Sequence, residues 1–399
     1  MSVSTPPVLV AIAAPARSLR SFGPNWFAAV MGTGIVANAA ATLPGTAPGL
    51  LVLARGVWVL DAALLLVVVV GTALHWLHHP AAARRHLEDP VMAHFYGAPA
   101  MALLTVGAGA LLLGQPLLGV DGAVAVDAVL WTVGTVLGLV TAVAVPYRAF
   151  TTHRVGMDAA FGGWLMPVVP PMVSAATGPL LIAQLPPGDA RLTLQLACMM
   201  MFGLTLVTSL MIITMIWSRL MHHQVGAAAA VPTLWIVLGP VGQSITAAHT
   251  LGATAPTSLP APYGEAVGTL DVLYGVPMWG FAMLWLALAL SITIRTARSG
   301  LPFTLTWWSF TFPVGTVVAG TSGLAAATGA PFLAAAAVLG YGALVLAWAV
   351  VAARTVHAVR RGVLLGATPV PDLVDLDAAG GIRLRPRHDG PSARGGSSP

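Results

Sequence analysis

Charge is scarce in this sequence of 399 residues, and lysine is absent from it altogether. Acidic and basic residues make up 8% of the chain, whereas soluble domains carry about 25%. With 57% hydrophobic residues and a mean hydropathy of +0.86, a water-soluble fold of this length could not cover its surface with polar groups. Lipid must therefore be the solvent over much of the protein, and the composition predicts an integral membrane protein.

Cysteine is almost as scarce, with one residue in the whole chain. This count excludes a disulfide framework and any cysteine-rich metal site, and we expect neither a metal ion nor another cofactor. The sequence pI near 10.1 would suit a nucleic-acid-binding protein. The arginines, however, lie between apolar segments and near the C-terminus, where membrane topology explains them better. We therefore expect membrane lipid, and no nucleic acid, as a partner.

Long apolar stretches account for most of the chain. A spanning helix needs about 20 mostly apolar residues, and the sequence shows no alternation long enough for the strands of a closed barrel. The predicted fold class is therefore all-α, with ten transmembrane helices over residues 21–358, between a cytoplasmic N-terminal segment (1–20) and a disordered cytoplasmic tail (359–399). The ten predicted spans are 24–43, 51–76, 93–114, 123–146, 161–184, 191–217, 231–251, 266–293, 303–327 and 331–356.

The arginines between these spans predict their orientation. Sixteen of the 18, all except Arg55 and Arg191, lie before the first span, in the loops that follow even-numbered spans, or at the C-terminal end. The loops 115–122, 252–265 and 328–330 contain none. Since arginine-rich loops stay in the cytoplasm, both termini are predicted to be cytoplasmic, in a multi-pass protein of the plasma (inner) membrane.

An internal repeat relates the odd-numbered spans, which begin near residues 24, 93, 162, 232 and 303, about 70 residues apart. Each contains residues that break or bend a helix. These residues are Gly32, Thr33 and Gly34; Pro99; Pro167, Pro170 and Pro171; Gly239 and Pro240; and Pro313. Breaks at one depth in five equivalent helices predict that these helices surround a common axis, inside five smoother ones. The alternative is that glycine and proline are simply frequent in transmembrane helices.

Four segments resemble the tellurite-resistance/dicarboxylate transporter family: PNWFAAVMGTGIVA (24–37), PVVPPMVSAATG (167–178), PTLWIVLGPVGQS (232–244) and WWSFTFPVGTV (307–317). This family includes fungal malate permeases and sulfite efflux pumps, a bacterial tellurite-resistance protein and the slow anion channels of plant guard cells. The resemblance covers residues 20 to 358. It implies ten helices arranged as five helical hairpins around a central pore, in a homotrimer with a pore inside each protomer. Many members have His-Pro before the third helix, where this chain has Asp-Pro.

Candidate pore residues lie on the odd-numbered spans. In channel members of the family, a phenylalanine in a segment similar to TFP plugs the pore, and the matching residue here is Phe312. An aromatic ring in a narrow pore can block it sterically and by dewetting, and the alternative is a ring that only packs against core or lipid. The residues predicted to line or kink the pore are Gly32, Thr33, Gly34, Pro99, Pro170, Pro240, Gln243, Ser244, Thr311 and Pro313. Polar groups of this kind also serve as ordinary helix-packing contacts.

Two ionisable residues inside spans, Asp61 and His249, are possible proton sites, because ionisable groups at membrane depth are costly and often functional. For Asp61 the alternative is a structural pair with Arg55 or with another helix.

The predicted function is transport of small anions: a C4-dicarboxylate such as malate, sulfite, or inorganic anions. The alternative is a proton-coupled carrier or efflux pump for the same anions, as in tellurite or sulfite resistance. No HExxH, DxxxD or GxSxG motif lies within a span, so we expect no enzyme activity.

Overall fold

The structure, a computed structural model, describes residues 19–365, and this part of the chain is built from helices without a strand. The predicted N-terminal segment lies outside the described residues except for its last two, and so does the predicted tail beyond residue 365. The α-helices are α1 (Phe27–Thr42), α2 (Pro48–His78), α3 (Pro80–Glu88), α4 (Gly97–Gly109), α5 (Gln115–Thr151), α6 (Pro170–Ile182), α7 (Asp189–His223), α8 (Leu238–Ser258), α9 (Tyr263–Arg298), α10 (Phe312–Thr328) and α11 (Pro331–Arg360). The 3₁₀ segments are η1 (Leu19–Ser21), η2 (Pro24–Trp26), η3 (Met92–Tyr96), η5 (Gly162–Leu165), η6 (Ala228–Val237) and η7 (Leu305–Phe310), and η4 (Ala110–Gly114) is a π-helical turn.

Seven helical stretches of the described residues are long and apolar enough to cross a membrane. One of them, Met92–Thr151, contains both α4 and α5. It bends at Gly119, whose φ of 71° lies in the left-handed region that glycine adopts readily. By themselves α1 and α6, with 16 and 13 residues, are too short to count among the seven. The chain is therefore an all-helical, multi-pass membrane protein, as its composition predicts.

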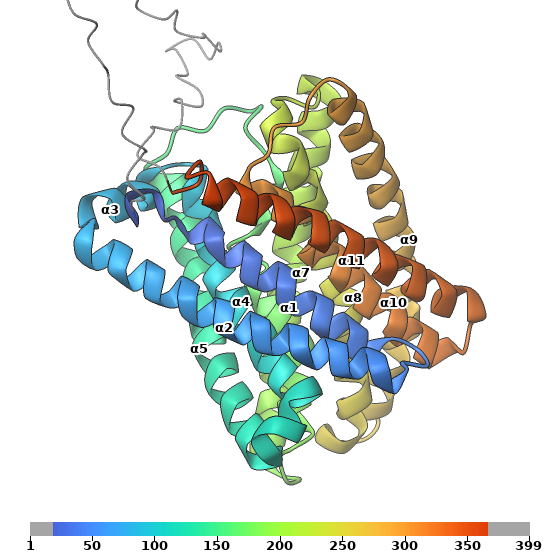
Figure 1. The fold of residues 1–399 in the computed structure, drawn as a ribbon. Helices are drawn as coiled ribbons and strands as arrows, with labels where there is room; N and C mark the ends of the chain where they lie inside the picture. The colour runs from blue at the N-terminus through green and yellow to red at the C-terminus, as the bar shows by residue number, and fades with distance from the viewer. Residues whose placement is uncertain (1–18, 366–399) are drawn as a thin grey trace, which may run out of the picture.

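Five helices form the inside of the bundle. Helix α1 packs against α4, α4 against α6, α6 against α8, α8 against α10, and α10 returns to α1, so the contacts close a ring. We call these the inner helices. The outer helices α2, α5, α7, α9 and α11 each pack against the inner helix that precedes them in the chain, and α2, α5 and α9 run along the margins of the bundle in Figure 1.

Burial separates the two sets of helices. In the apolar window of η6 and α8, 83% of the residues are buried, whereas the figure for α11 is 17%. The outer helices expose leucine and valine over most of their length, for example Leu53, Leu66 and Val143. A lipid solvent explains this exposed apolar surface, because the outer helices then bury their side chains against acyl chains rather than protein.

Each inner helix follows a 3₁₀ segment directly or after a short turn, which is residues 166–169 before α6 and Thr311 before α10. The inner α-helices start at residues 27, 97, 170, 238 and 312, which repeats the spacing of about 70 residues seen in the sequence. Pro99, Pro170, Pro240 and Pro313 all lie in the first turn of an α-helix. There the missing N–H of proline removes no helical hydrogen bond. The predicted breaks at these four prolines are thus junctions between a 3₁₀ segment and an α-helix.

The predicted break at Gly32, Thr33 and Gly34 is wrong, because α1 continues through all three as regular α-helix. Its junction lies earlier, between Trp26 and Phe27. The two glycines allow close packing instead. A Cβ atom at Gly32 would overlap the Thr311 hydroxyl, and one at Gly34 would overlap the carboxylate of Asp61.

Other glycines bring the inner segments together at the ring contacts. A Cβ atom at Gly97, the first residue of α4, would overlap the backbone carbonyl of Met166. One at Gly162 would overlap the carbonyl of Thr233 in η6. Since backbone atoms cannot move aside as a side chain can, both positions require glycine at the observed distance between neighbouring segments.

Candidate pore site at the axis of the inner helices

A small cavity, with about 30 Å³ of room for water-sized molecules, lies on the axis of the ring. All five inner segments contribute to its wall, and nearly every lining side chain is apolar. The lining residues are Ala28, Met31, Met101, Met166, Val169, Ile236, Gly239, Pro240, Trp308, Ser309, Phe312 and Pro313. They stand close to the junctions between 3₁₀ segments and α-helices. The sequence repeat puts these junctions at one depth, and it therefore also determines where the cavity lies.

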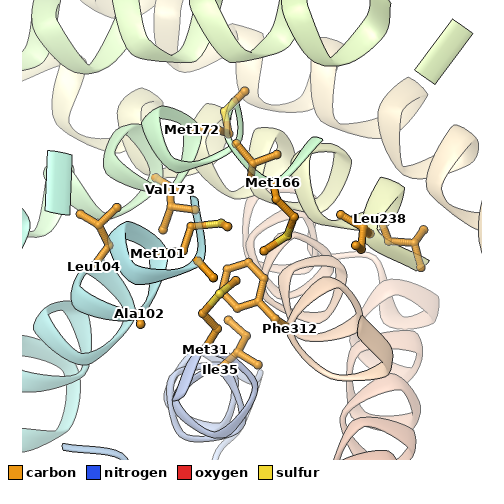
Figure 2. Close-up of a cluster of buried hydrophobic side chains, with 14 of the residues drawn as sticks. Met31, Ile35, Met101, Ala102, Leu104, Met166, Met172, Val173, Leu238 and Phe312 are labelled. Carbon is orange, nitrogen blue, oxygen red and sulfur yellow. The ribbon is translucent and has the colours of Figure 1, made fainter. Parts of the chain in front are cut away.

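Phe312 lines this cavity, and its ring lies among side chains of neighbouring inner segments. Figure 2 shows its ring between Met31 and Ile35 of α1 on one side and Met101 and Met166 on the other. Only 4% of the residue is exposed. A ring that meets side chains from several inner segments leaves little open space along the axis.

The backbone around Phe312 is fixed by its neighbours. Phe312 is the first residue of α10, and Pro313 follows in the second position, where its restricted φ suits a helix start. The Thr311 hydroxyl donates to the Trp308 carbonyl at 2.7 Å, which closes the end of η7. On the next turn, a Cβ atom at Gly315 would overlap Ile35, so α10 lies directly against α1. These contacts aim the ring at the axis.

Phe310, two residues earlier, has a different environment. Its ring meets Trp235 edge to face at 5.2 Å between centroids and Trp307 at 5.7 Å. It is half-buried and does not line the cavity. The two phenylalanines of this segment are therefore a matched pair, one on the axis and one away from it.

Three methionines that sequence reasoning did not select form a collar around Phe312. The methionine collar consists of Met31, Met101 and Met166, and it lines the cavity from α1, α4 and the turn before α6. Thioether side chains are flexible and pack well on aromatic rings. The sequence does carry a signal for them, because Met31 and Met101 stand 70 residues apart, at equivalent places in the repeat.

Most predicted pore-lining residues lie off the cavity. Of that set, only Pro240 and Pro313 belong to its lining, together with the predicted gate Phe312. The Thr33 hydroxyl accepts a hydrogen bond at 3.1 Å from Trp348 of α11, so it serves the contact between helices. The Ser244 hydroxyl donates to the carbonyl one turn earlier, at Val241, at 2.7 Å. The remaining predicted residues, Gly32, Gly34, Pro99, Pro170, Gln243 and Thr311, do not line the cavity either.

The two predicted proton sites lie in different parts of the bundle. His249 Nδ1 and Asp271 Oδ2 are 2.7 Å apart between α8 and α9, with 30% and 9% of the side chains exposed. Asp61 is fully buried against Gly34, and within residues 19–365 neither of its carboxylate oxygens has a hydrogen-bond partner. The alternative that Asp61 pairs with Arg55 does not hold, because neither Asp61 carboxylate oxygen has a partner among the described residues and the Arg55 Nε–H donates to the Leu113 carbonyl at 3.1 Å.

Comparison with known proteins shows which proteins this chain resembles. Residues 21–356 match the family described as voltage-dependent anion channels. A sulfite efflux pump of Arthroderma otae is 28% identical over 311 residues, which is 76% of this chain and 82% of that protein. A sulfite efflux pump of Trichophyton rubrum is 26% identical over 321 residues, 79% of this chain and 84% of the pump. An uncharacterized transporter of Methanocaldococcus jannaschii is 27% identical over 303 residues, 75% of this chain and 83% of the transporter.

Proposed function

Since the chain belongs to the family of voltage-dependent anion channels, the family that its sequence segments predicted, we propose that small anions cross the membrane along the axis of its inner helices. Phe312 is the gate of this path. The observation that carries the proposal is the axial cavity, to which all five inner segments contribute and which Phe312 lines with its ring among their side chains. A narrow apolar constriction blocks ions by excluding their water, and the ring adds a steric block.

The architecture that fits this path is ten transmembrane helices arranged as five hairpins around a central pore. Seven stretches meet the criterion for a span by themselves, and the longest of them, Met92–Thr151, has length for two. The remaining two spans are α1 and α6, each lengthened by the 3₁₀ segment that precedes it. Each hairpin then pairs one inner helix with the outer helix that follows it, as their contacts support.

Sulfite is the anion that we propose first. The relatives with a named substrate are sulfite efflux pumps, and they align over most of this chain. C4-dicarboxylates such as malate, and inorganic anions, remain candidates of the same class. None of the residues that line the cavity carries a positive charge, so the site favours weak binding and rapid passage over tight recognition of one anion.

A proton-coupled carrier for the same anions is the second candidate function. The hydrogen-bonded pair of His249 and Asp271 favours it, because ionisable pairs at membrane depth are typical of proton relays. His249 keeps 30% of its side chain exposed, so the pair is not sealed inside the protein. In this model, proton movement at the pair would drive anion export against a gradient.

Anion flux in proteoliposomes containing the full-length protein tests both candidates. We expect the protein to speed the entry of sulfite, with malate, nitrate and chloride as the other anions of the panel. Absence of flux for every anion, from folded protein, would refute the proposed function. A pH gradient that drives accumulation would favour the carrier, provided that the effect is lost in His249→Gln and kept in His222→Gln, a histidine exposed at the end of α7.

A further inference from the structure

A basic pocket lies at the end of α2, away from the axial cavity. Its polar lining side chains are Arg20 of η1, His78 and His79 at the end of α2, and Arg85 of α3. The backbone at the start of α3 completes the wall, and the pocket has a volume of about 250 Å³. Among the described residues, 19–365, none of those that line the pocket is acidic. The pocket therefore gathers positive charge for an anionic ligand.

The pocket opens at the depth where lipid headgroups lie. Helix α2 is one of the stretches that can cross a membrane, and its last turn exposes Leu74, Trp76 and Leu77 by 37%, 36% and 73%. These apolar side chains need acyl chains around them, and tryptophan is enriched at the boundary between acyl chains and headgroups. The basic residues begin directly after them, at His78. Figure 1 shows α3 beside this end of α2, at the edge of the bundle.

The positions of the basic side chains are set by packing rather than by chance on a loose surface. His75 Nδ1 lies 2.7 Å from the Leu19 carbonyl, which ties η1, and with it Arg20, to α2. Helix α3 begins at the pocket, where the N–H groups of Ala82 and Ala83 both donate to the His79 carbonyl, at 2.9 and 3.0 Å. No side chain caps this helix start, so its positive end also faces the pocket.

We propose that the basic pocket binds the phosphate group of an anionic phospholipid. Arginine matches a phosphate with two parallel hydrogen bonds, and Arg85, exposed on α3, lines the pocket, to whose wall Arg20 adds a second positive charge. Basic pockets at the ends of transmembrane helices favour anionic headgroups electrostatically. Because the opening lies at headgroup depth, a lipid phosphate reaches it at a far higher local concentration than a soluble phosphate does. This binding site is independent of the proposed anion path.

Thermal unfolding of the full-length protein in a neutral detergent tests the pocket. Short-chain phosphatidylglycerol should raise the unfolding temperature in a saturable way, and phosphatidylcholine with the same chains should not. Arg85→Gln should weaken the apparent affinity for phosphatidylglycerol about fivefold, the effect of one arginine at such a surface. The matched control is Arg84→Gln. Arg84, the preceding residue of α3, is also exposed and has the same charge, but it does not line the pocket.

Three results would overturn the proposal. An equal weakening in Arg84→Gln would mean that diffuse surface charge, not the pocket, attracts the lipid. An equal response to phosphatidylcholine would mean that acyl chains alone bind. Inorganic phosphate that stabilises the protein as well as phosphatidylglycerol at the same concentration would identify a soluble ligand instead. If Arg85→Gln does not fold, His79→Gln takes its place, and an unchanged affinity in that folded variant would also reject the site.

Discussion

Phe312 is the residue on which the space along the axis depends most. Its ring is only 4% exposed and stands among side chains from several inner segments. If it gates the path, Phe312→Ala removes a steric barrier, and we expect anion flux several-fold above wild type. Such a gain is unusual, since deleting a large buried side chain normally only destabilises a protein, by about 3–5 kcal/mol. Flux into proteoliposomes, corrected for the amount of folded protein, measures it.

Phe310→Ala is the control for this prediction. Phe310 packs on Trp235 and Trp307 and does not line the cavity, so its loss should leave flux at or below the wild-type level. Unchanged flux in both variants would make Phe312 a packing residue and place the gate elsewhere. Loss of flux in Phe312→Ala would favour a carrier that needs the ring to close around its substrate.

At the scale of single residues, the sequence identified Phe312 but not the side chains that surround it. Phe312 was selected because the segment TFP resembles a known family, and the structure places it on the axis. The methionine collar was missed because the search for pore residues looked for polar groups and helix breakers, whereas the cavity wall is apolar. Gln243 and Ser244 were selected for their polarity, yet Ser244 bonds to its own helix at Val241. Polarity in a membrane helix marks a group that needs a partner, and that partner is often the backbone nearby.

At the scale of helices, the ring depends on backbone contacts that only glycine permits. Gly97→Ala would place a methyl group on the Met166 carbonyl, between α4 and the turn before α6. We expect this variant to lose about 1–3 kcal/mol of stability, because neither backbone can move without disturbing the ring. Thermal unfolding in detergent measures the loss. Gly203→Ala in α7, where a Cβ atom would meet open space, should be neutral or slightly stabilising, and an equal loss in both variants would contradict the argument.

The helix starts could be predicted from proline, because its missing N–H and fixed φ act locally wherever it stands. Four of the five junctions lie within two residues of a proline for this reason. The fifth could not be predicted, because glycine has no fixed local effect: Gly32 and Gly34 could break a helix or allow close contact, and only the neighbouring segments decide between the two. The side chains that meet them, Thr311 and Asp61, come from other helices. The pair of Asp61 with Arg55 failed similarly, since Arg55 bonds to Leu113, far along the chain.

For the whole molecule, the repeat predicted more than any single motif did. Five similar units that each bury one helix will tend to close on themselves, and the contacts from α1 round to α10 do so.

The oligomeric state has no such signal in the sequence, because an apolar outer helix can face either lipid or another protomer. The homotrimer that the family resemblance implies therefore stays a prediction. Native mass spectrometry from nanodiscs should give three chains per particle, and a single chain with full flux would show that the trimer is not needed for transport.

The last prediction concerns orientation, and it follows from arginine-bearing segments that meet at one end of the bundle. Arg219, near the end of α7, donates to the Asp158 carbonyl at 3.2 Å, which joins the segments that follow α5 and α7. Near the first and last described residues, Ser21 bonds to the Leu364 carbonyl at 3.5 Å. By the positive-inside rule, we expect this end to be cytoplasmic. The only cysteine of the chain, Cys198, is fully buried, so single cysteines introduced elsewhere can be labelled against a low background.

A membrane-impermeant maleimide added to intact cells should label Leu118→Cys, beside the bend at Gly119, and Thr257→Cys, in the last turn of α8. It should miss Arg154→Cys until the cells are opened, because Arg154 lies in the arginine-bearing loop that follows α5. Wild-type protein, treated in the same way, gives the background level of labelling. Strong labelling of Arg154→Cys in intact cells would reverse the orientation. Labelling of only one of Leu118→Cys and Thr257→Cys would be inconsistent with ten spans, since an even number of crossings separates these two positions and places them on the same side.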